Sequence, residues 1–177
     1  MVTYRPTFID GLLYDGPWMN KALLNAIYFS SSLYSDRTSV RSASAARLSA
    51  GARYYHRFRE LLSGPDDQTS IPTAMGLVIC AASLLSRGHG REAIELRKKA
   101  RHMLVKLELD SIDSAPKYKF PLTKFPHEIE KEINNRLRLG IFALDTLITL
   151  YLGEPIASHL PMLPMGRMRD NFEENQD

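Results

Sequence analysis

Residues 127–164 read HEIEKEINNRLRLGIFALDTLITLYLGEPIASHLPMLP, and this stretch decides the fold. It begins as an acidic, polar helix and becomes apolar almost all round near Leu139, as expected of a helix that enters a core. One carboxylate, Asp145, lies inside the apolar run. The run stops at Gly-Glu-Pro, residues 153–155, and a glycine with a following proline is common where a helix ends. The stretch therefore predicts a long core helix with a defined end.

The rest of the chain also shows helical periodicity, without a convincing alternating strand pattern. The apolar spacing predicts further helices over residues 18–34, 38–62, 71–85 and 91–107. Residues 38–62 form either one helix or a pair broken at Gly51. We therefore predict an all-α fold, a single domain of five to six packed helices over residues 1–164. Residues 165–177 lack periodicity and are expected to be a polar, disordered tail.

Turn and cap residues set the helix boundaries. Residues 16–17, Gly-Pro, are a natural start for the first of these helices. Ser70 with Pro72 is typical of a capped helix start with an early proline, and Pro126 suits the first position of the last helix. Residues 110–126, rich in proline and lysine, are expected to be a long loop.

The composition is that of an ordinary globular domain, with 44% apolar and 24% charged residues in 177 and a net charge of +3. The charge is uneven, because residues 37–64 hold six arginines against one glutamate and residues 91–106 hold six Lys/Arg against two. We interpret both segments as solvated helix faces. A nucleic acid or an acidic protein is the alternative partner for them.

The single cysteine, Cys80, lies in an apolar run and is expected to be a buried, inert thiol in a reducing, intracellular compartment. The first residues lack the order of a secretory signal. The longest apolar stretch, residues 139–152, contains Asp145 and is shorter than the about 20 residues of a spanning helix. We therefore expect a soluble protein without a membrane partner.

Motifs that carry enzymatic chemistry are incomplete in this chain. His127-Glu128 would begin a zinc-protease HExxH helix, but Lys131 stands where the second histidine belongs. Residues 88–90, Gly-His-Gly, are too short for a dinucleotide-binding loop, and residues 30–32, Ser-Ser-Ser, have no partner base in view. We predict no catalytic residues, no metal ligands and no cofactor in this chain.

Asp145 is the one acid whose burial the sequence predicts. A buried carboxylate needs a partner, and we expect an ion pair or hydrogen bond to a neighbouring helix, with the arginines of residues 37–59 as candidates. The alternative is a ligand-sensing carboxylate in an interior cavity. Residues 97–102, Arg-Lys-Lys-Ala-Arg-His, are interpreted as a solvated face, with an import signal or nucleic-acid contact as the alternative.

Taken in order, several segments resemble the fungal-specific transcription factor domain, the regulatory region of binuclear zinc-cluster activators and repressors, including the xylanolytic activator type. Tyr4 to Phe8, with Arg5 and Pro6, looks like the HRPTF-type opening of that domain. Similar helices are LLNAIYFSSSLY at residues 23–34, RYYHRFRELL at 53–62, residues 71–85, and residues 91–110.

The closing segment completes the resemblance, which covers about residues 4–164 and is carried by the ordered set of segments. The family pattern runs from an E-x-R-R-R segment through an apolar run to Asp, then G-R-P and a PLP-like element. The matching positions here are Glu132, Arg136, Phe142, Leu144, Asp145, Gly153, Pro155 and Leu160-Pro161. The chain departs from the pattern at Asn134-Asn135, at Arg138-Leu139 and at Glu154, which replaces the arginine of G-R-P.

The resemblance implies a non-enzymatic, nuclear regulatory domain that takes part in RNA polymerase II transcription. The implied partners are proteins of the transcription machinery and a small-molecule effector. DNA binding and zinc would belong to a zinc-cluster module that is missing from this sequence, so the chain would be truncated relative to the family domain or a cofactor-like relative. The alternative function is a tetratricopeptide-type α-helical scaffold, and a third is direct nucleic-acid binding.

Overall fold

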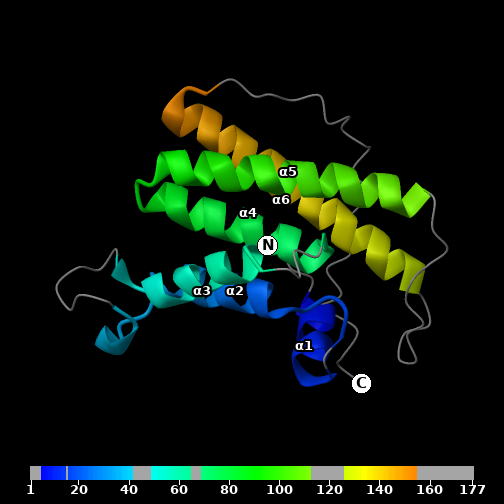
Figure 1. The fold of residues 1–177 in the computed structure, drawn as a ribbon, viewed down its shortest axis with the longest axis horizontal. Helices are drawn as coiled ribbons and strands as arrows, with labels where there is room; N and C mark the ends of the chain where they lie inside the picture. The colour runs from blue at the N-terminus through cyan, green and yellow to red at the C-terminus, as the bar shows by residue number, and fades with distance from the viewer. Residues whose placement is uncertain (1–4, 15, 42–48, 65–68, 113–125, 155–177) are drawn as a thin grey trace, which may run out of the picture.

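The computed structural model describes residues 5–14, 16–41, 49–64, 69–112 and 126–154, and within them it contains helices and no strand (Figure 1). The α-helices are α1 (Arg5–Tyr14), α2 (Lys21–Ser32), α3 (Ala52–Leu62), α4 (Ile71–Ser86), α5 (Gly90–Ile112) and α6 (Pro126–Leu152), and a short 3-10 helix, η1, spans Thr38–Val40. The prediction of an all-α domain of five to six helices is confirmed. None of these helices combines the length and apolar character that crossing a membrane requires.

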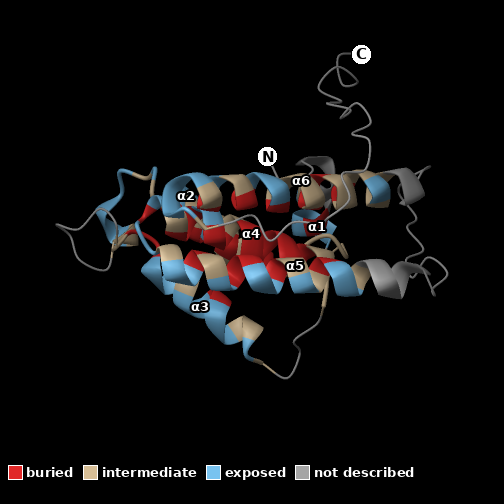
Figure 2. Ribbon diagram, turned by 90° about the horizontal axis from the view of Figure 1, so that it is seen from above, coloured by how far each residue is buried: buried red, intermediate tan, exposed pale blue. Residues whose placement is uncertain are grey.

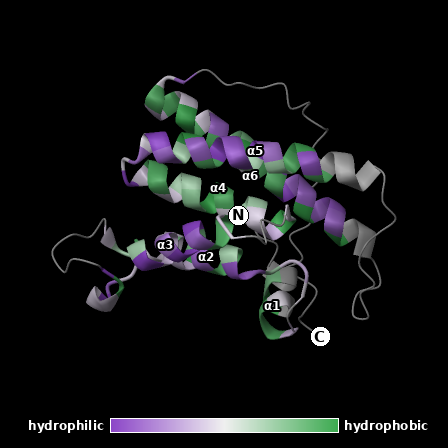
Figure 3. Ribbon diagram, viewed as in Figure 1, coloured by the Kyte–Doolittle hydropathy of each residue, from purple (hydrophilic) through white to green (hydrophobic). Residues whose placement is uncertain are grey.

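Helix α4 lies at the centre of the domain and contacts α2, α5 and α6, while α3 covers α2 (Figures 1 and 2). It is the most apolar helix, and Figure 3 shows the contrast with the hydrophilic α3. Most of its residues are buried, including Met75, Leu77, Cys80 and Leu84. A helix that is apolar on all sides lowers its free energy by being surrounded, which explains its central place.

The N-termini of α2 and α4 are joined by their capping residues. Asn20 Oδ1 accepts a hydrogen bond from the Leu23 backbone N–H at 2.8 Å, and Asn20 Nδ2 donates to Thr73 Oγ1 at 2.8 Å. Ser70 Oγ accepts from the Thr73 backbone N–H at 3.3 Å, so the predicted cap is confirmed. Gly16-Pro17 does not start α2, because Asn20 supplies the side-chain acceptor that those residues lack. The shared caps hold α2 and α4 parallel.

Gly76 allows the close contact among α2, α3 and α4. A Cβ at this position would lie 3.0 Å from Phe58 Cε2 and 3.5 Å from Ala26 Cβ. Phe58 is fully buried there. A Cβ at residue 76 would therefore require the Phe58 side chain of α3 to shift by a few tenths of an ångström.

Gly51, with a φ of 78°, directly precedes α3, so residues 38–62 do not form one continuous helix. The helix predicted before Gly51 is wrong for its described residues, because residues 38–41 and 49–50 contain no α-helix. Residues 42–48 and 113–125 and the tail lie outside the described residues, so the structure does not test the predictions made for them. Helix α5 is longer than predicted and ends at Ile112. Helix α1 was not predicted, because RPTFIDGLLY places apolar residues on every side and has no helical periodicity.

Candidate functional site

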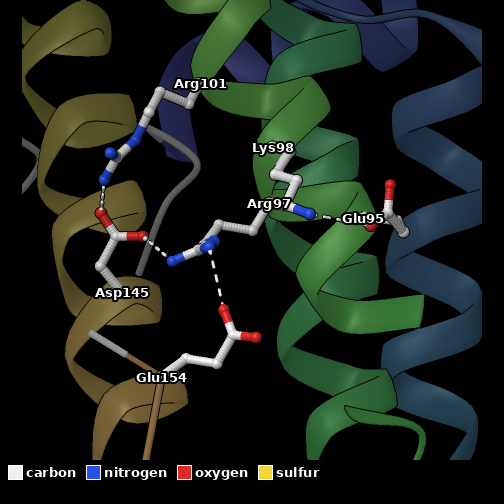
Figure 4. Close-up of polar contacts among 6 residues, drawn as sticks. All are labelled: Glu95, Arg97, Lys98, Arg101, Asp145 and Glu154. Carbon is white, nitrogen blue, oxygen red and sulfur yellow. Dashed lines mark hydrogen bonds and ion pairs between the residues drawn. The ribbon is translucent and has the colours of Figure 1, made fainter. Parts of the chain in front are cut away.

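The buried carboxylate of Asp145 is the centre of a charge cluster between α5 and α6 (Figure 4). Asp145 is 2% exposed. Its Oδ1 accepts a hydrogen bond from Arg97 Nη1 at 3.3 Å, and its Oδ2 accepts one from Arg101 Nη2. The two arginines are four residues apart on α5 and therefore lie on one face of that helix. The predicted ion pair of Asp145 is present, but its partners are on α5 and not among residues 37–59.

Glu154 completes this cluster from the end of α6. Its Oε2 lies 3.8 Å from Arg97 Nη2. Gly153, with a φ of 69°, takes the left-handed conformation that ends the helix, and its N–H donates to the Thr149 carbonyl oxygen at 3.0 Å. The turn directs Glu154 back towards α5. Two guanidinium groups thus meet two carboxylates, and the four charges balance.

The interpretation of residues 97–102 as a solvated face is wrong for the two arginines. Arg97 is buried and Arg101 is only partly exposed, whereas Lys98 and Lys99 are exposed. Lys98 Nζ contacts Glu95 Oε1 at 3.1 Å on the surface of α5 (Figure 4). The helical period explains the difference, because residues 97 and 101 share the core-facing side with Ala93 and Ala100.

The geometry of the cluster suits a structural lock between α5 and α6. A buried carboxylate is tolerated when guanidinium groups neutralise it and donate hydrogen bonds to it. The start of α5 also contacts the end of α6, since a Cβ on Gly90 would lie 2.9 Å from Leu152 Cδ1. The two helices therefore run antiparallel with a fixed register. In the part of the chain that the structure describes, no group of three or more His, Cys, Asp or Glu residues could hold a metal ion.

Arg87 is a second buried cation, and the sequence reasoning missed its role. Its Nη1 donates to the Ala50 carbonyl oxygen at 2.6 Å and its Nη2 to the Phe29 carbonyl oxygen at 2.8 Å. Its guanidinium also lies over the Phe29 ring, 4.1 Å from the centroid. Burial lowers the pKa of Arg87. The sequence places Arg87 just after an apolar helix, and this position could have indicated a buried role. The same position is equally typical of an exposed arginine that bonds the last carbonyl groups of a helix.

Tyr55 connects α3 to α5. Its hydroxyl donates a hydrogen bond to Glu92 Oε2 at 3.0 Å, and its ring stacks on Phe29 with a centroid distance of 4.9 Å. Burial, followed by the bond to Glu92, raises the pKa of Tyr55. Burial likewise raises the pKa of Cys80, which agrees with the prediction of an inert thiol.

The remaining positions of the closing sequence pattern do not all meet at this cluster. Glu132 Oε1 accepts a hydrogen bond from Arg136 Nε at 2.7 Å, within α6 itself. Phe8 lies on α1 and is partly buried, and the α1 backbone also includes Arg5 and Pro6, whose side chains are not described. Pro155 lies outside the described residues. Among the predicted positions that the structure describes, Asp145 and Gly153 help to form the cluster.

A family model described as "Fungal specific transcription factor domain" matches residues 4–165. No curated protein matches, and no solved structure matches.

Proposed function

The chain belongs to the fungal specific transcription factor domain family, and from this premise we propose that it is the regulatory domain of a fungal zinc-cluster transcription factor. In this proposal the domain does not read DNA, acts in the nucleus and modulates transcription by RNA polymerase II. The single observation that carries it is the family match, which spans nearly the whole chain.

The placement of two arginines of α5 supports a role without direct DNA reading. Proteins that bind nucleic acid use exposed arginines and lysines against phosphates. Arg97 and Arg101, in the basic segment of residues 91–106, instead bond Asp145 inside the fold. Binding of DNA would come from a zinc-cluster module elsewhere in the protein, and zinc would belong to that module.

The proposed mechanism is a change in helix packing that an effector or a partner protein favours. A ligand shifts such an equilibrium only through its different affinity for the two packings. The α5–α6 charge cluster is a suitable point for this shift, because its ion pairs depend on the exact register of both helices. The domain would act by binding alone and not as an enzyme, with a small molecule and proteins of the transcription machinery as partners.

The helix lengths do not favour the alternative of a tetratricopeptide scaffold. Such a repeat fits two helices into about 34 residues. Helix α5 alone has 23 residues and α6 has 27. A pair of such helices exceeds the length of one repeat.

A reporter assay tests the proposed function. The full chain is fused to a heterologous DNA-binding domain with an activation segment, and reporter transcription is measured in fungal cells. We expect reporter output from the fusion to differ at least several-fold from that of the same fusion without the chain. Asp145→Asn should alter the size of this difference, and Lys98→Gln should not. Equal output with and without the chain, at equal protein levels, would contradict a regulatory role.

A further inference from the structure

The side of α3 that faces away from the core is exposed and basic. We call it the α3 outer face, and its residues, all exposed, are Arg53, His56, Arg57, Arg59 and Glu60. Three arginines stand here against one glutamate, which gives a net charge of +2 when the histidine is neutral. Figure 2 shows the exposed colour along this helix. Phe58 is buried on the opposite side, so the helical period separates this face from the core.

Two tyrosine rings border the α3 outer face. Tyr28 of α2 is 46% exposed, and the centroid of its ring lies 5.3 Å from that of Tyr54 on α3. Tyrosine and arginine are the residue types that most often dominate the binding energy of protein interfaces. The basic face therefore has an aromatic margin against which an apolar side chain of a partner can pack.

The contact with Tyr54 holds Arg53 in place before a partner binds. The Arg53 guanidinium lies over the Tyr54 ring, 4.7 Å from its centroid, and Arg53 Nη2 donates to the Tyr54 hydroxyl at 2.7 Å. A side chain that is already ordered loses less conformational entropy on binding. A guanidinium has five N–H groups, and it binds a carboxylate through two parallel hydrogen bonds. Arg53, which is exposed, is therefore preorganised for a carboxylate that arrives from solvent.

Glu60 favours an acidic protein over a nucleic acid as the partner. Its carboxylate oxygens lie 2.7 Å from Arg57 Nη1 and 3.1 Å from His56 Nδ1. A phosphate backbone carries a negative charge at every nucleotide, so along this face it would meet the Glu60 carboxylate. The arginines of α3 also span only about 9 Å of helix axis, from residue 53 to residue 59. A protein segment can place single carboxylates at Arg53 and Arg59 and leave Glu60 without a contact.

We propose that the α3 outer face, with the rings of Tyr28 and Tyr54, is the docking surface for an acidic protein segment. Arg53 and Arg59 bind carboxylates of the segment, and an apolar side chain of the segment packs on the two tyrosine rings. The positive charge of the face attracts an acidic segment and disfavours a basic one. Added salt should weaken the attraction. This inference stands independently of the proposed function, because it concerns binding alone.

Fluorescence anisotropy with the full chain measures this binding. The probe is a fluorescein-labelled peptide of about twelve residues that alternates glutamate with leucine, and the control peptide has glutamine at each glutamate position. We expect the acidic peptide to bind at low salt with a Kd of about 10 to 300 µM. The glutamine peptide should bind at least about tenfold more weakly, because it keeps the apolar side chains and loses the charges.

Two variants with the same change in net charge separate the α3 outer face from general attraction by a basic chain. Arg53→Glu should weaken binding of the acidic peptide at least about tenfold. Lys106→Glu, at an exposed residue towards the other end of α5 from Glu92, which contacts α3, should weaken it less than about twofold. Arg53→Lys keeps the charge but loses the planar guanidinium, and it should weaken binding about threefold.

Three results would overturn the proposal. The first is an acidic peptide that does not bind up to about 1 mM, and the second is an equal effect of Arg53→Glu and Lys106→Glu. The third is a thymidine oligonucleotide of the same length that binds more tightly than the peptide and is lost with Arg53→Glu, since the face would then belong to a nucleic acid.

The acidic residues of the chain's own segment 170–177 are the remaining alternative occupant. Replacing each aspartate of this segment with asparagine and each glutamate with glutamine should leave the affinity for the acidic peptide unchanged. A gain in affinity of about tenfold or more would show that this segment competes for the α3 outer face. The occupant would then be the chain itself, which also overturns the proposal.

Discussion

At the scale of single residues, the position of Asp145 determines which arginines leave the surface. The carboxylate lies on the side of α6 that faces α5, and two arginines of α5 turn inward to neutralise it. The energetic gain of such a cluster is small, because desolvation of the charges offsets their attraction. Loss of one partner is costly, because the other charges stay buried without compensation.

Asp145→Ala is therefore expected to lower the free energy of unfolding by about 3 to 5 kcal/mol, measured by urea denaturation. Glu95→Ala removes the exposed partner of Lys98 and is the control, with an expected change below about 1 kcal/mol. The triple variant Arg97→Met, Arg101→Met, Asp145→Leu replaces the cluster with apolar side chains and should recover most of the stability. If Asp145→Ala and Glu95→Ala lowered the free energy of unfolding equally, the buried charge cluster would not hold α5 and α6 together.

At the scale of helices, the shared caps of α2 and α4 couple two segments that are distant in the sequence. Asn20 closes the first turn of α2 and also donates to Thr73 on α4. Each cap alone is a local feature. Because Asn20 bonds both helices, the stability that its cap contributes depends on the parallel arrangement of α2 and α4.

A double-mutant cycle measures this coupling. Asn20→Ala and Thr73→Val should each lower the unfolding free energy by about 1 kcal/mol or more, and their coupling should be about 0.5 to 1.5 kcal/mol. Asn25→Ala removes a hydrogen bond within α2 alone, from Asn25 Nδ2 to the Lys21 carbonyl oxygen, and is the control. Additive effects of the Asn20 and Thr73 substitutions would show that the two caps act separately.

The helices were more predictable from the sequence than their contacts were. The Ser70 cap could be predicted correctly because capping depends on adjacent residues. The arginine partners of Asp145 could not be identified, because pairing depends on which faces of α5 and α6 meet after packing. Arg87 was missed for the same reason, since its two acceptors are backbone carbonyls of Phe29 and Ala50. Long-range polar contacts leave no periodic signal.

At the scale of the whole molecule, α4 contacts α2, α5 and α6. Titratable groups buried around α4 therefore affect the free energy of unfolding of the whole domain. Cys80 lies within α4, and the partly buried Tyr55 on α3 packs against the core and bonds Glu92 on α5. Burial raises the pKa of both groups above their ordinary values of 9.0 and 10.0. The folded state therefore holds these protons at a pH at which the unfolded chain releases them.

Stability should consequently be fully present below about pH 9 and should fall as the pH rises beyond the unfolded values of 9 and 10. Unfolding free energies measured between neutral and alkaline pH should show this decline. Cys80→Ala should remove the loss of stability that begins near pH 9.0, the ordinary pKa of a cysteine thiol. Tyr55→Phe should remove the loss that begins near pH 10.0, the ordinary pKa of a tyrosine hydroxyl. A double variant with an unchanged alkaline slope would assign the decline to other groups.

The contact between Glu154 and Arg97 has a consequence for the evolution of the family. In the resemblance to the family pattern, Glu154 takes the place of an arginine, and its carboxylate lies 3.8 Å from the buried guanidinium of Arg97. An arginine at residue 154 would place a third positive charge beside Arg97 and Arg101, with Asp145 alone to balance them. Substitutions at positions 97 and 154 are therefore expected to occur together across lineages, so that a relative with arginine after the helix-ending glycine carries an uncharged or acidic residue at the position of Arg97.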